Sequence, residues 1–538
     1  MAELHQQLRQ NGLEPKPPPS THLDYGSGRS FLDPEVLQQD SWADPGLPGA
    51  LTPVMRRADR QGSLSALLPD FRPGCIGDNY LGVSTANNWL SPIEGTSLAL
   101  FGMKLNLTEF LPPESDPAAA DMSYEVFLLH SLGKDSRPPC PPLPDYEEYK
   151  VLADWYFKSV QIFIPFLHRP DFMKLMSAVY AGQYQPNTAE TVMLHMVIMI
   201  MQFQFYCRMG GDEYRNKAMA HYHYSISMIS DLIRGHTLQD LQALVLICSQ
   251  LRNQPRPGAA WSFLNFVFGL VIESGLHRSA GNWQGEAAEK DPHKIELRKR
   301  IFWSLLLLHV CVSGPLGRPM PIRLEDFDIE MPEIRPDSLP EDEITSPWRQ
   351  CSFRTAPYGF RLVKILMRVY STLYAIRPSS ARQDMTVQSI LQELDDVRRD
   401  LPAELTGGQD TVEEDRLPSL LLLLRDHSIR LILHHPSLCH SQSPQSMASN
   451  LDACLKACNG MLYAGTQLSH LKALDITWIQ TTEYLAAVFT TLFVHTQRKD
   501  QLSSDTIRQL RQDMDAWLAI MDVIGPALGK LTLLASLF

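Results

Sequence analysis

Apolar residues recur at the three- and four-residue spacing of amphipathic helices from about residue 146 onward. In residues 384–400, for example, Val387, Ile390 and Leu394 share one face, while charged residues occupy the opposite face. Alternating patterns typical of strands are nearly absent. The spacing predicts helices at 146–160, 187–209, 212–234, 237–252, 259–274, 292–313, 357–376, 384–400, 417–434, 447–470, 472–497 and 503–530.

Two proline-rich breaks, near residues 315–340 and 436–445, interrupt this helical region. No fixed period recurs along the chain, which argues against a solenoid. We therefore predict an all-α fold for residues 146–530, a multi-helix domain of packed antiparallel helices. A sub-boundary could fall near 336–356.

Residues 1–145 have a different composition from the rest of the chain. They contain 19 of the 39 prolines, with clusters at EPKPPPS and SRPPCPPLP. Because proline donates no backbone hydrogen bond, so proline-rich a segment builds little regular structure. We expect a largely irregular N-terminal region, with a disordered or linker segment at 1–78 and a proline-rich arm at 79–145 that docks on the helical domain.

The segment KRIFWSLLLLHVCVSGPLGRPMPI, residues 299–322, contains the end of the helix predicted at 292–313. Asp291 is placed to cap the start of that helix, and a proline at the first helical position supports this start. Apolar residues cover every face, so the helix is predicted to be central and Trp303 deeply buried. Gly314, which is followed by a proline, suits a left-handed C-terminal cap.

The overall composition is that of a soluble protein, with 44% hydrophobic and 20% charged residues. The net charge of -12 argues against broad nucleic-acid binding. The longest apolar runs, MVIMIM and SLLLLHVCV, are far shorter than the roughly 20 residues that span a bilayer, so no membrane contact is expected. Nine cysteines without a CxxC pair or an apolar leader indicate reduced thiols in the nucleus or cytosol.

Common catalytic and cofactor motifs are absent from the sequence. It contains no GxSxG, GxxxxGK[ST] or HExxH, and we predict no catalytic, cofactor-binding or metal-binding residue. His434, His435, Cys439 and His440 have the residue types of metal ligands, but Pro436 separates them, and ordinary surface or capping roles are the alternative. DDVRRD faintly resembles the Asp-rich metal motif of helical terpene synthases, but its spacing differs and it fits a solvated helix face.

Four methionines, Met193, Met196, Met199 and Met201, fall in one predicted helix. Because methionine is flexible and polarizable, these side chains could line an adaptable ligand pocket. The alternative is that they fill gaps in the core.

The segment RKRIFWSLLLLHVCVSGPLGRPMPIRLEDFDIEMP, residues 298–332, resembles the regulatory middle homology domain of fungal zinc-cluster transcription factors. The shared pattern is basic residues, Phe-Trp, an apolar helix, Leu-Gly-Arg-Pro and an Asp-x-Asp segment before a proline. FIPFLHRPDF, LQDLQALVLICSQLRN, AAWSFLNFVFGLVIESGLHRS, VRRDLPAEL and HSIRLILHHPSL are similar to other blocks of the family, in the same order. The motif residues are His277, Arg278, Arg298, Arg300, Phe302, Trp303, Leu316, Gly317, Arg318, Pro319, Asp326, Asp328 and Pro332.

The resemblance implies a nuclear transcription regulator of a metabolic or biosynthetic gene set. In the family the helical domain gates activation, so a small-molecule effector and the transcription machinery or co-regulators are the implied partners, and a homodimer is compatible with it. A stand-alone co-regulator without DNA binding is one alternative. An all-α enzyme with an apolar pocket, such as a terpene cyclase, is another, but the missing acidic metal motifs disfavour it.

The chain departs from the family pattern in two respects. His309-Val310 stands where the family usually has Asp-Arg, so any ion pair of that Asp with a buried arginine such as Arg278 or Arg300 would be replaced. The family's DNA-binding module needs six closely spaced cysteines, and only two cysteines precede Cys207. We therefore expect no cofactor in this chain, with zinc and DNA binding only through a zinc-cluster module encoded upstream.

Arg318 follows the predicted central helix and stands before Pro319, which favours an extended backbone at the arginine. Acidic residues follow at Glu325, Asp326 and Asp328. One hypothesis is a structural clamp, in which the guanidinium binds loop carbonyls or a carboxylate. The other is a switch contact that reports the state of the core to an activation surface.

Overall fold

The computed structural model describes residues 70–71, 80–81, 123–133, 137–253, 257–282, 289–342, 350–375, 383–407, 411, 413–435, 444–499 and 502–525, and all structural statements concern these residues. Two short strands, β1 (Asp70–Phe71) and β2 (Tyr80–Leu81), pair antiparallel, and the remaining regular structure in these ranges is helical. The predicted all-α class is thereby confirmed. Except for β1, the segment predicted to be disordered at 1–78 lies outside the described residues.

The chain forms the following helices, which include one π-helix (η5) and several short 3₁₀ helices (the other η elements). They are α6 (Tyr124–Leu132), α7 (Tyr146–Trp155), η5 (Tyr156–Val160), η6 (Gln161–Phe163), α8 (Arg169–Tyr180), α9 (Thr188–Met209), α10 (Asp212–Ile226), α11 (Ile229–Gly235), α12 (Leu238–Leu251), α13 (Pro257–Glu273), η7 (Ala280–Asn282), α14 (Pro292–Ser313), η8 (Leu324–Asp326), α15 (Ala356–Thr372), α16 (Gln383–Arg399), η11 (Ala403–Leu405), α17 (Glu413–His434), α18 (Pro444–His470), α19 (Trp478–Gln497) and α20 (Ser504–Ile524).

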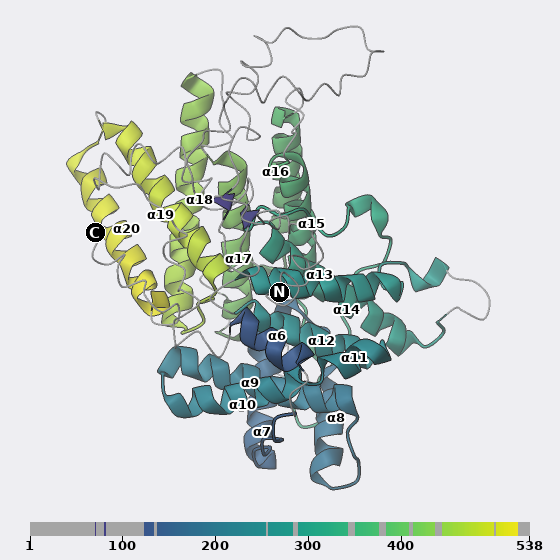
Figure 1. Ribbon diagram of the computed structural model, residues 1–538. Helices are drawn as coiled ribbons and strands as arrows, with labels where there is room; N and C mark the ends of the chain where they lie inside the picture. Colours follow the sequence, from purple (N-terminus) through teal and green to yellow (C-terminus); the bar gives the residue numbers. More distant parts are fainter. Residues whose placement is uncertain are drawn as a thin grey trace, which may run out of the picture. The chain divides into compact units, whose positions relative to one another are not determined.

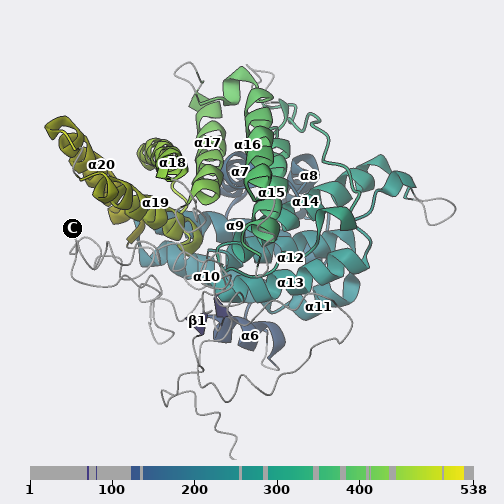
Figure 2. The ribbon, with the colours of Figure 1, turned by 90° about the horizontal axis from the view of Figure 1, so that it is seen from above.

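Helices that are neighbours in sequence pack against one another, as Figures 1 and 2 show for α9 and α10 and for α17 and α18. The chain reverses between α9 and α10 at Gly210 and Gly211, whose positive φ angles of 71° and 99° suit glycine. The helix α14 packs on α12, α13 and α15, while α18 packs on α17, α19 and α20. Much of the apolar surface is therefore buried between long helices, and α14 packs against three of them.

The central helix α14 starts and ends where the sequence predicts. Asp291 caps it, because its Oδ1 accepts a hydrogen bond from the backbone N–H of His293 at 2.9 Å. The predicted left-handed cap at Gly314 is wrong: this residue stays right-handed, with φ and ψ both -58°. The left-handed residue is Gly317, with φ 65°. It comes three residues later because residues 314–316 continue as a turn after the last helical residue.

Glycine is needed at position 314 because α14 lies against a tyrosine of α15. A Cβ atom on Gly314 would come within 2.1 Å of the Tyr370 ring. We therefore expect Gly314→Ala to lower the free energy of unfolding by about 1–3 kcal/mol, the usual cost of overpacking. Urea unfolding followed by circular dichroism measures the change.

The matched control is Gly269→Ala in α13, where the added Cβ would meet nothing within 4 Å. This variant should gain about 0.5–1 kcal/mol, because alanine favours a helix over glycine. Equal stability of the two variants would show that α14 and α15 are not in close contact at this point.

Several helix boundaries differ from the sequence pattern. The helix predicted at 146–160 ends at Trp155 and widens into η5. The helix predicted at 212–234 is two helices, because Ser225 and Ser227 bond backbone carbonyls of the preceding turn and loosen the helix there. The pattern missed α6 and α8, which are short and bury few apolar residues.

Part of the predicted arm is described, and it contacts the helical region. The helix α6 packs on α10 and α11. Its Phe127 is buried and meets the ring of Phe263 edge to face, at 5.1 Å between centroids. The following segment is held by an ion pair between Arg137 and Asp231, at 2.8 Å.

The helix α9 is the one described helix that is long and apolar enough to cross a membrane by length and composition. However, 67% of its apolar window is buried inside the protein, as expected of a core helix. Its His195 meets His221 of α10 through their Nδ1 atoms, 2.7 Å apart. Both rings are buried, so this contact is a polar link inside the core.

Candidate functional site

The family-motif residues hold an irregular segment, residues 324–332, across the end of α13 and the side of α14. We call this segment the strap. Asp328 of the strap accepts hydrogen bonds from Arg278 Nε at 3.0 Å and from the backbone N–H of Ser279 at 2.8 Å. The carbonyl of His277 in turn accepts from the backbone N–H groups of Asp328 and Ile329. The strap is thereby fixed to the turn after α13 by side chains and backbone together.

Trp303 is the point at which α14 meets the strap. It is 2% exposed, and its Nε1–H donates to the carbonyl of Glu330 at 2.9 Å. Its ring packs edge to face on Phe327 of the strap and stacks on Phe360 of α15, with centroids 5.6 and 5.5 Å apart. Phe302, which is fully buried, lies beside it. The predicted burial of Trp303 is confirmed, and one side chain joins three elements.

In the described structure, Arg298 and Arg300 of the motif have hydrogen-bond partners other than the family's usual aspartate. Arg300 is 2% exposed, and its Nε donates to Glu296 of the same helix at 3.1 Å. Its guanidinium also lies over the ring of Phe353, 4.0 Å from the centroid. Arg298 donates to the carbonyl of Gly275 at 2.7 Å. Arg300 therefore has an acidic partner within its own helix, in Glu296.

His309, which stands in place of that aspartate, belongs to a buried polar network. Its Nδ1 lies 2.8 Å from Ser313 Oγ, and this hydroxyl accepts from Trp261 Nε1 at 3.1 Å. The guanidinium of Arg318 lies over the Trp261 ring, 4.5 Å from its centroid. Burial lowers the pKa of His309 to about 4, so the ring is neutral near pH 7. The network thus links α13, α14 and Arg318 without a carboxylate.

The acidic residues that follow Arg318 have arginine partners elsewhere. Asp326 pairs with Arg323 at 2.9 Å on the surface, and Asp328 pairs with Arg278. Arg318 itself is 8% exposed, and its backbone N–H donates to the carbonyl of Ser313. The clamp and switch hypotheses for this arginine both stay predictions.

A cavity lies between α9, α12, α14, α15 and α17, and residues of η6 and of the turn before α19 also line it. Its volume is about 480 Å³. Pockets that bind small molecules have volumes of about 300–1,000 Å³, so this one has the size for such a ligand. Its apolar walls include Met201, Leu308, Leu366 and Leu421, from four different helices.

One side of the cavity carries a buried ion pair between α17 and α19. Arg425 Nη1 lies 2.9 Å from Glu483 Oε1, and the glutamate is 3% exposed. Glu483 also accepts hydrogen bonds from Ser428 and Gln480. Burial acts to lower the pKa of Arg425, but the surrounding groups, Glu483 first among them, together raise it by more, so the arginine stays charged.

Two further arginines line the same side. Arg252, at the end of α12, pairs with Asp475 at 3.1 Å. Burial acts to raise the pKa of Asp475, but Arg252, the backbone and side chain of Thr477, and Arg425 together lower it by more, so the carboxylate stays ionised. Arg208 donates from Nε to the carbonyl of Lys472. The cavity is therefore an apolar space with fixed charges at one end, which suits a ligand with an apolar body and a polar group.

The other candidate residues from the sequence lie elsewhere. Of the four methionines, Met201 lines this cavity, whereas Met193, Met196 and Met199 are buried in the core and do not. Their role in ligand binding stays a prediction. His434 contacts Asn450 at 3.2 Å and its carbonyl accepts from Cys454, while Cys439 and His440 lie outside the described residues.

Sequence reasoning missed the charged residues of the cavity. The available signal was a single charge inside a largely uncharged run, as for Glu483 in TTEYLAAVF, and an Arg-Asp pair directly after a leucine run, as for Arg425 in LLLLLRDHS. A charged residue at a buried helix position needs a partner, so each of these positions indicates an ion pair.

Comparison with known proteins gives a family for part of the chain. The sequence profile described as the fungal specific transcription factor domain matches residues 153–399. "Activator of stress genes 1" of Saccharomyces cerevisiae is 24% identical over 412 residues, which cover 72% of this chain and 41% of that protein.

Two other relatives have related descriptions. An "ABC-transporter-regulating transcription factor" of Aspergillus oryzae is 25% identical over 303 residues, 56% of this chain and 31% of that protein. A "Positive regulator of purine utilization" of Emericella nidulans is 24% identical over 259 residues, 38% of this chain and 24% of that protein. The chain thus matches less than half the length of these relatives.

Proposed function

Residues 153–399 of this chain constitute a fungal specific transcription factor domain, and on that basis we propose that the chain is a transcription regulator controlled by a small-molecule effector. The observation that carries the effector hypothesis is the cavity of about 480 Å³ between α9, α12, α14, α15 and α17. The names of the relatives support the regulatory role, since each is described as an activator, a regulator or a transcription factor.

The lining of the cavity indicates the chemical class of the effector. Most of its walls are leucine, isoleucine and other apolar side chains, which favour an apolar body. Arg208, Arg252 and Arg425 stand at one end, next to two carboxylates. A molecule with an apolar body and one anionic or hydrogen-bonding group fits this arrangement.

Binding in this cavity would act on the arrangement of helices. The walls come from α9, α12 and α14 on one side and from α15 and α17 on the other. A ligand that fills the space better in one arrangement of these helices shifts the population toward it. This shift would expose or cover a surface for the transcription machinery or a co-regulator.

The remaining parts of the proposal follow from the family. The chain would act in the nucleus, and its DNA contact would come from a zinc-cluster module, since the net charge of this chain is -12. A co-regulator that works without DNA binding is the second candidate. An enzymatic role has no motif in the sequence to support it.

The test fills the cavity by mutation and probes it with a dye. 8-Anilinonaphthalene-1-sulfonate, which has an apolar body and a sulfonate, matches the lining, so the wild-type chain should bind it saturably with increased fluorescence. Leu421→Trp places a larger side chain at the cavity wall and should abolish this saturable phase. Fluorescence titration of the purified full chain measures both.

The matched control is Met385→Trp, which adds the same ring to a side chain of α16 that is 73% exposed. It should bind the dye as the wild type does. Identical titrations of wild type and Leu421→Trp, with both proteins folded by circular dichroism, would refute the effector cavity.

A further inference from the structure

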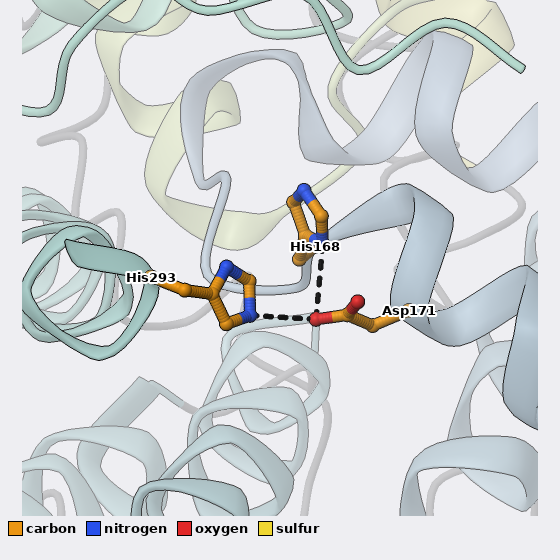
Figure 3. A group of neighbouring side chains, drawn as sticks. All are labelled: His168, Asp171 and His293. Atoms are coloured by element: carbon orange, nitrogen blue, oxygen red, sulfur yellow. Dashed lines mark ion pairs between the residues drawn. The ribbon is translucent and has the colours of Figure 1, made fainter. Parts of the chain in front are cut away.

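A cluster of two histidines and one aspartate lies outside the effector cavity, at the point where α8 and α14 begin (Figure 3). His168 Nδ1 lies 3.0 Å from Asp171 Oδ2, and His293 Nε2 lies 2.7 Å from the same oxygen. One ligand atom from each of the three residues lies within 4.8 Å of the other two. Both imidazoles therefore point to one carboxylate oxygen.

The three side chains come from two segments that are distant in sequence, and local structure positions each of them. His168 is the N-cap residue of α8, and Asp171 follows in the first turn of that helix. His293 is the second residue of α14, after Pro292 and the capping residue Asp291. Since proline at the first positions stiffens both helix starts, the three side chains are presented from well-defined backbone.

Hydrogen bonding leaves one of the ring nitrogens unsatisfied. His168 Nδ1 is buried and has no well-directed hydrogen bond, although it lies 3.0 Å from the carboxylate oxygen. When a ring nitrogen lies close to an acceptor but is badly aligned with it, the hydrogen bond between them is weak. An ion placed between the two atoms would use the nitrogen lone pair that faces the cluster.

The donor set selects a class of metal ion. Two imidazole nitrogens and one carboxylate oxygen suit zinc and its neighbours, whereas magnesium and calcium prefer oxygen ligands throughout. With bonds of about 2.0–2.1 Å, ligand atoms of a tetrahedral zinc site stand about 3.3 Å apart. The carboxylate oxygen, at 2.7 and 3.0 Å from the two nitrogens, would move slightly outward, and the two nitrogens, within 4.8 Å of each other, would adjust on partly exposed side chains.

Space for a fourth ligand is also present. A second cavity, of about 360 Å³, is lined by His168 and His293 together with Glu296 and Arg300. A water molecule can occupy such a space beside the ion, which completes four-coordination.

We propose that His168, Asp171 and His293 bind one divalent transition-metal ion of the zinc class. The ion would join the first turn of α8 to the first turn of the central helix α14. Metal binding would then stabilise the folded chain, because the unfolded chain does not hold the three residues together.

The test uses the full chain, freed of metal with a chelator, and zinc ions as the probe. Calorimetric titration near pH 7.5 should show one tight equivalent of Zn²⁺, and zinc should raise the melting temperature. Co²⁺ should give the visible absorption of a tetrahedral site. His293→Ala and Asp171→Asn should each weaken this equivalent by about 10–100-fold or more, as disturbed zinc sites do.

The matched control is His236→Ala. His236 is 40% exposed and also faces a carboxylate, Glu273, at 3.8 Å, whereas His293 is 44% exposed. This control should keep the zinc equivalent, the rise in melting temperature and the cobalt spectrum. The proposal is overturned if wild type binds no tight equivalent, or if the two cluster variants, both folded, bind zinc as the control does.

Discussion

Trp303→Ala is expected to lower the free energy of unfolding by about 3–5 kcal/mol, the range for removing a large buried aromatic side chain. The ring is 2% exposed and stacks between Phe327 and Phe360, so its loss leaves a cavity between α14, the strap and α15. The carbonyl of Glu330 also loses the N–H that it accepts at 2.9 Å. Urea unfolding of the full chain, followed by circular dichroism, measures this loss.

Two further variants separate the causes. Trp303→Phe keeps most of the apolar ring but removes the N–H, so it should cost about 1–3 kcal/mol, the penalty of an unsatisfied buried carbonyl. Trp155→Ala removes the same side chain at a position that is 57% exposed and should change stability by about 0.5 kcal/mol or less. Similar losses for Trp303→Ala and Trp155→Ala would contradict the central position of α14.

Arg425→Ala is expected to cost about 3–5 kcal/mol, because it leaves a buried carboxylate without its counter-ion. The carboxylate is that of Glu483, which is 3% exposed and lies 2.9 Å from the guanidinium. Ser428 and Gln480 remain as hydrogen-bond donors, but both are neutral and cannot replace the charge. Thermal unfolding and urea unfolding of the same preparations measure the cost.

The double variant Arg425→Met with Glu483→Leu should recover most of that stability, since apolar residues of similar volume often replace a buried ion pair without loss. The surface control is Arg323→Ala. Its side chain is 79% exposed and pairs with Asp326, so the change should be about 0–1 kcal/mol. If Arg425→Ala were as mild as the surface control, Glu483 would have to be solvated or protonated in the folded chain.

The sequence predicts helices best where local chemistry decides the structure. Both ends of α14 follow from Asp291 and Pro292 at its start and from the glycine and proline after its last turn. The reason for glycine at position 314 could not be predicted in this way. A Cβ atom there would clash with Tyr370, which lies far away in the sequence. The helix α8 escapes the pattern although it buries Phe172, Met173 and Met176, because its 12 residues give the periodicity little length.

The functional sites are harder to predict for the same reason. The effector cavity takes its walls from helices that are distant in sequence, and no local spacing encodes such a space. The His168, Asp171 and His293 cluster joins two helix starts, so only the pair at 168 and 171 has a recognisable spacing. By contrast, a lone charge in a largely uncharged run, such as Glu483, is visible in the sequence and indicates a buried partner.

The contact between His195 and His221 restricts the tautomers of both rings. Burial lowers their pKa values to about 4 and about 3, so near pH 7 each ring is neutral and carries a single N–H. Only one hydrogen fits between two Nδ1 atoms that are 2.7 Å apart, so one ring is protonated at Nδ1 and the other at Nε2.

The other ring nitrogen of His195 links the choice of tautomer to a residue at the surface. Its Nε2 lies 3.8 Å from the Sγ of Cys140, which is exposed. When the thiol donates its proton, Nε2 accepts it and His195 must be the Nδ1–H tautomer, which makes His221 the Nε2–H tautomer. When Sγ accepts instead, both tautomers reverse. The proton between α9 and α10 therefore takes its position from the direction of the hydrogen bond at Cys140.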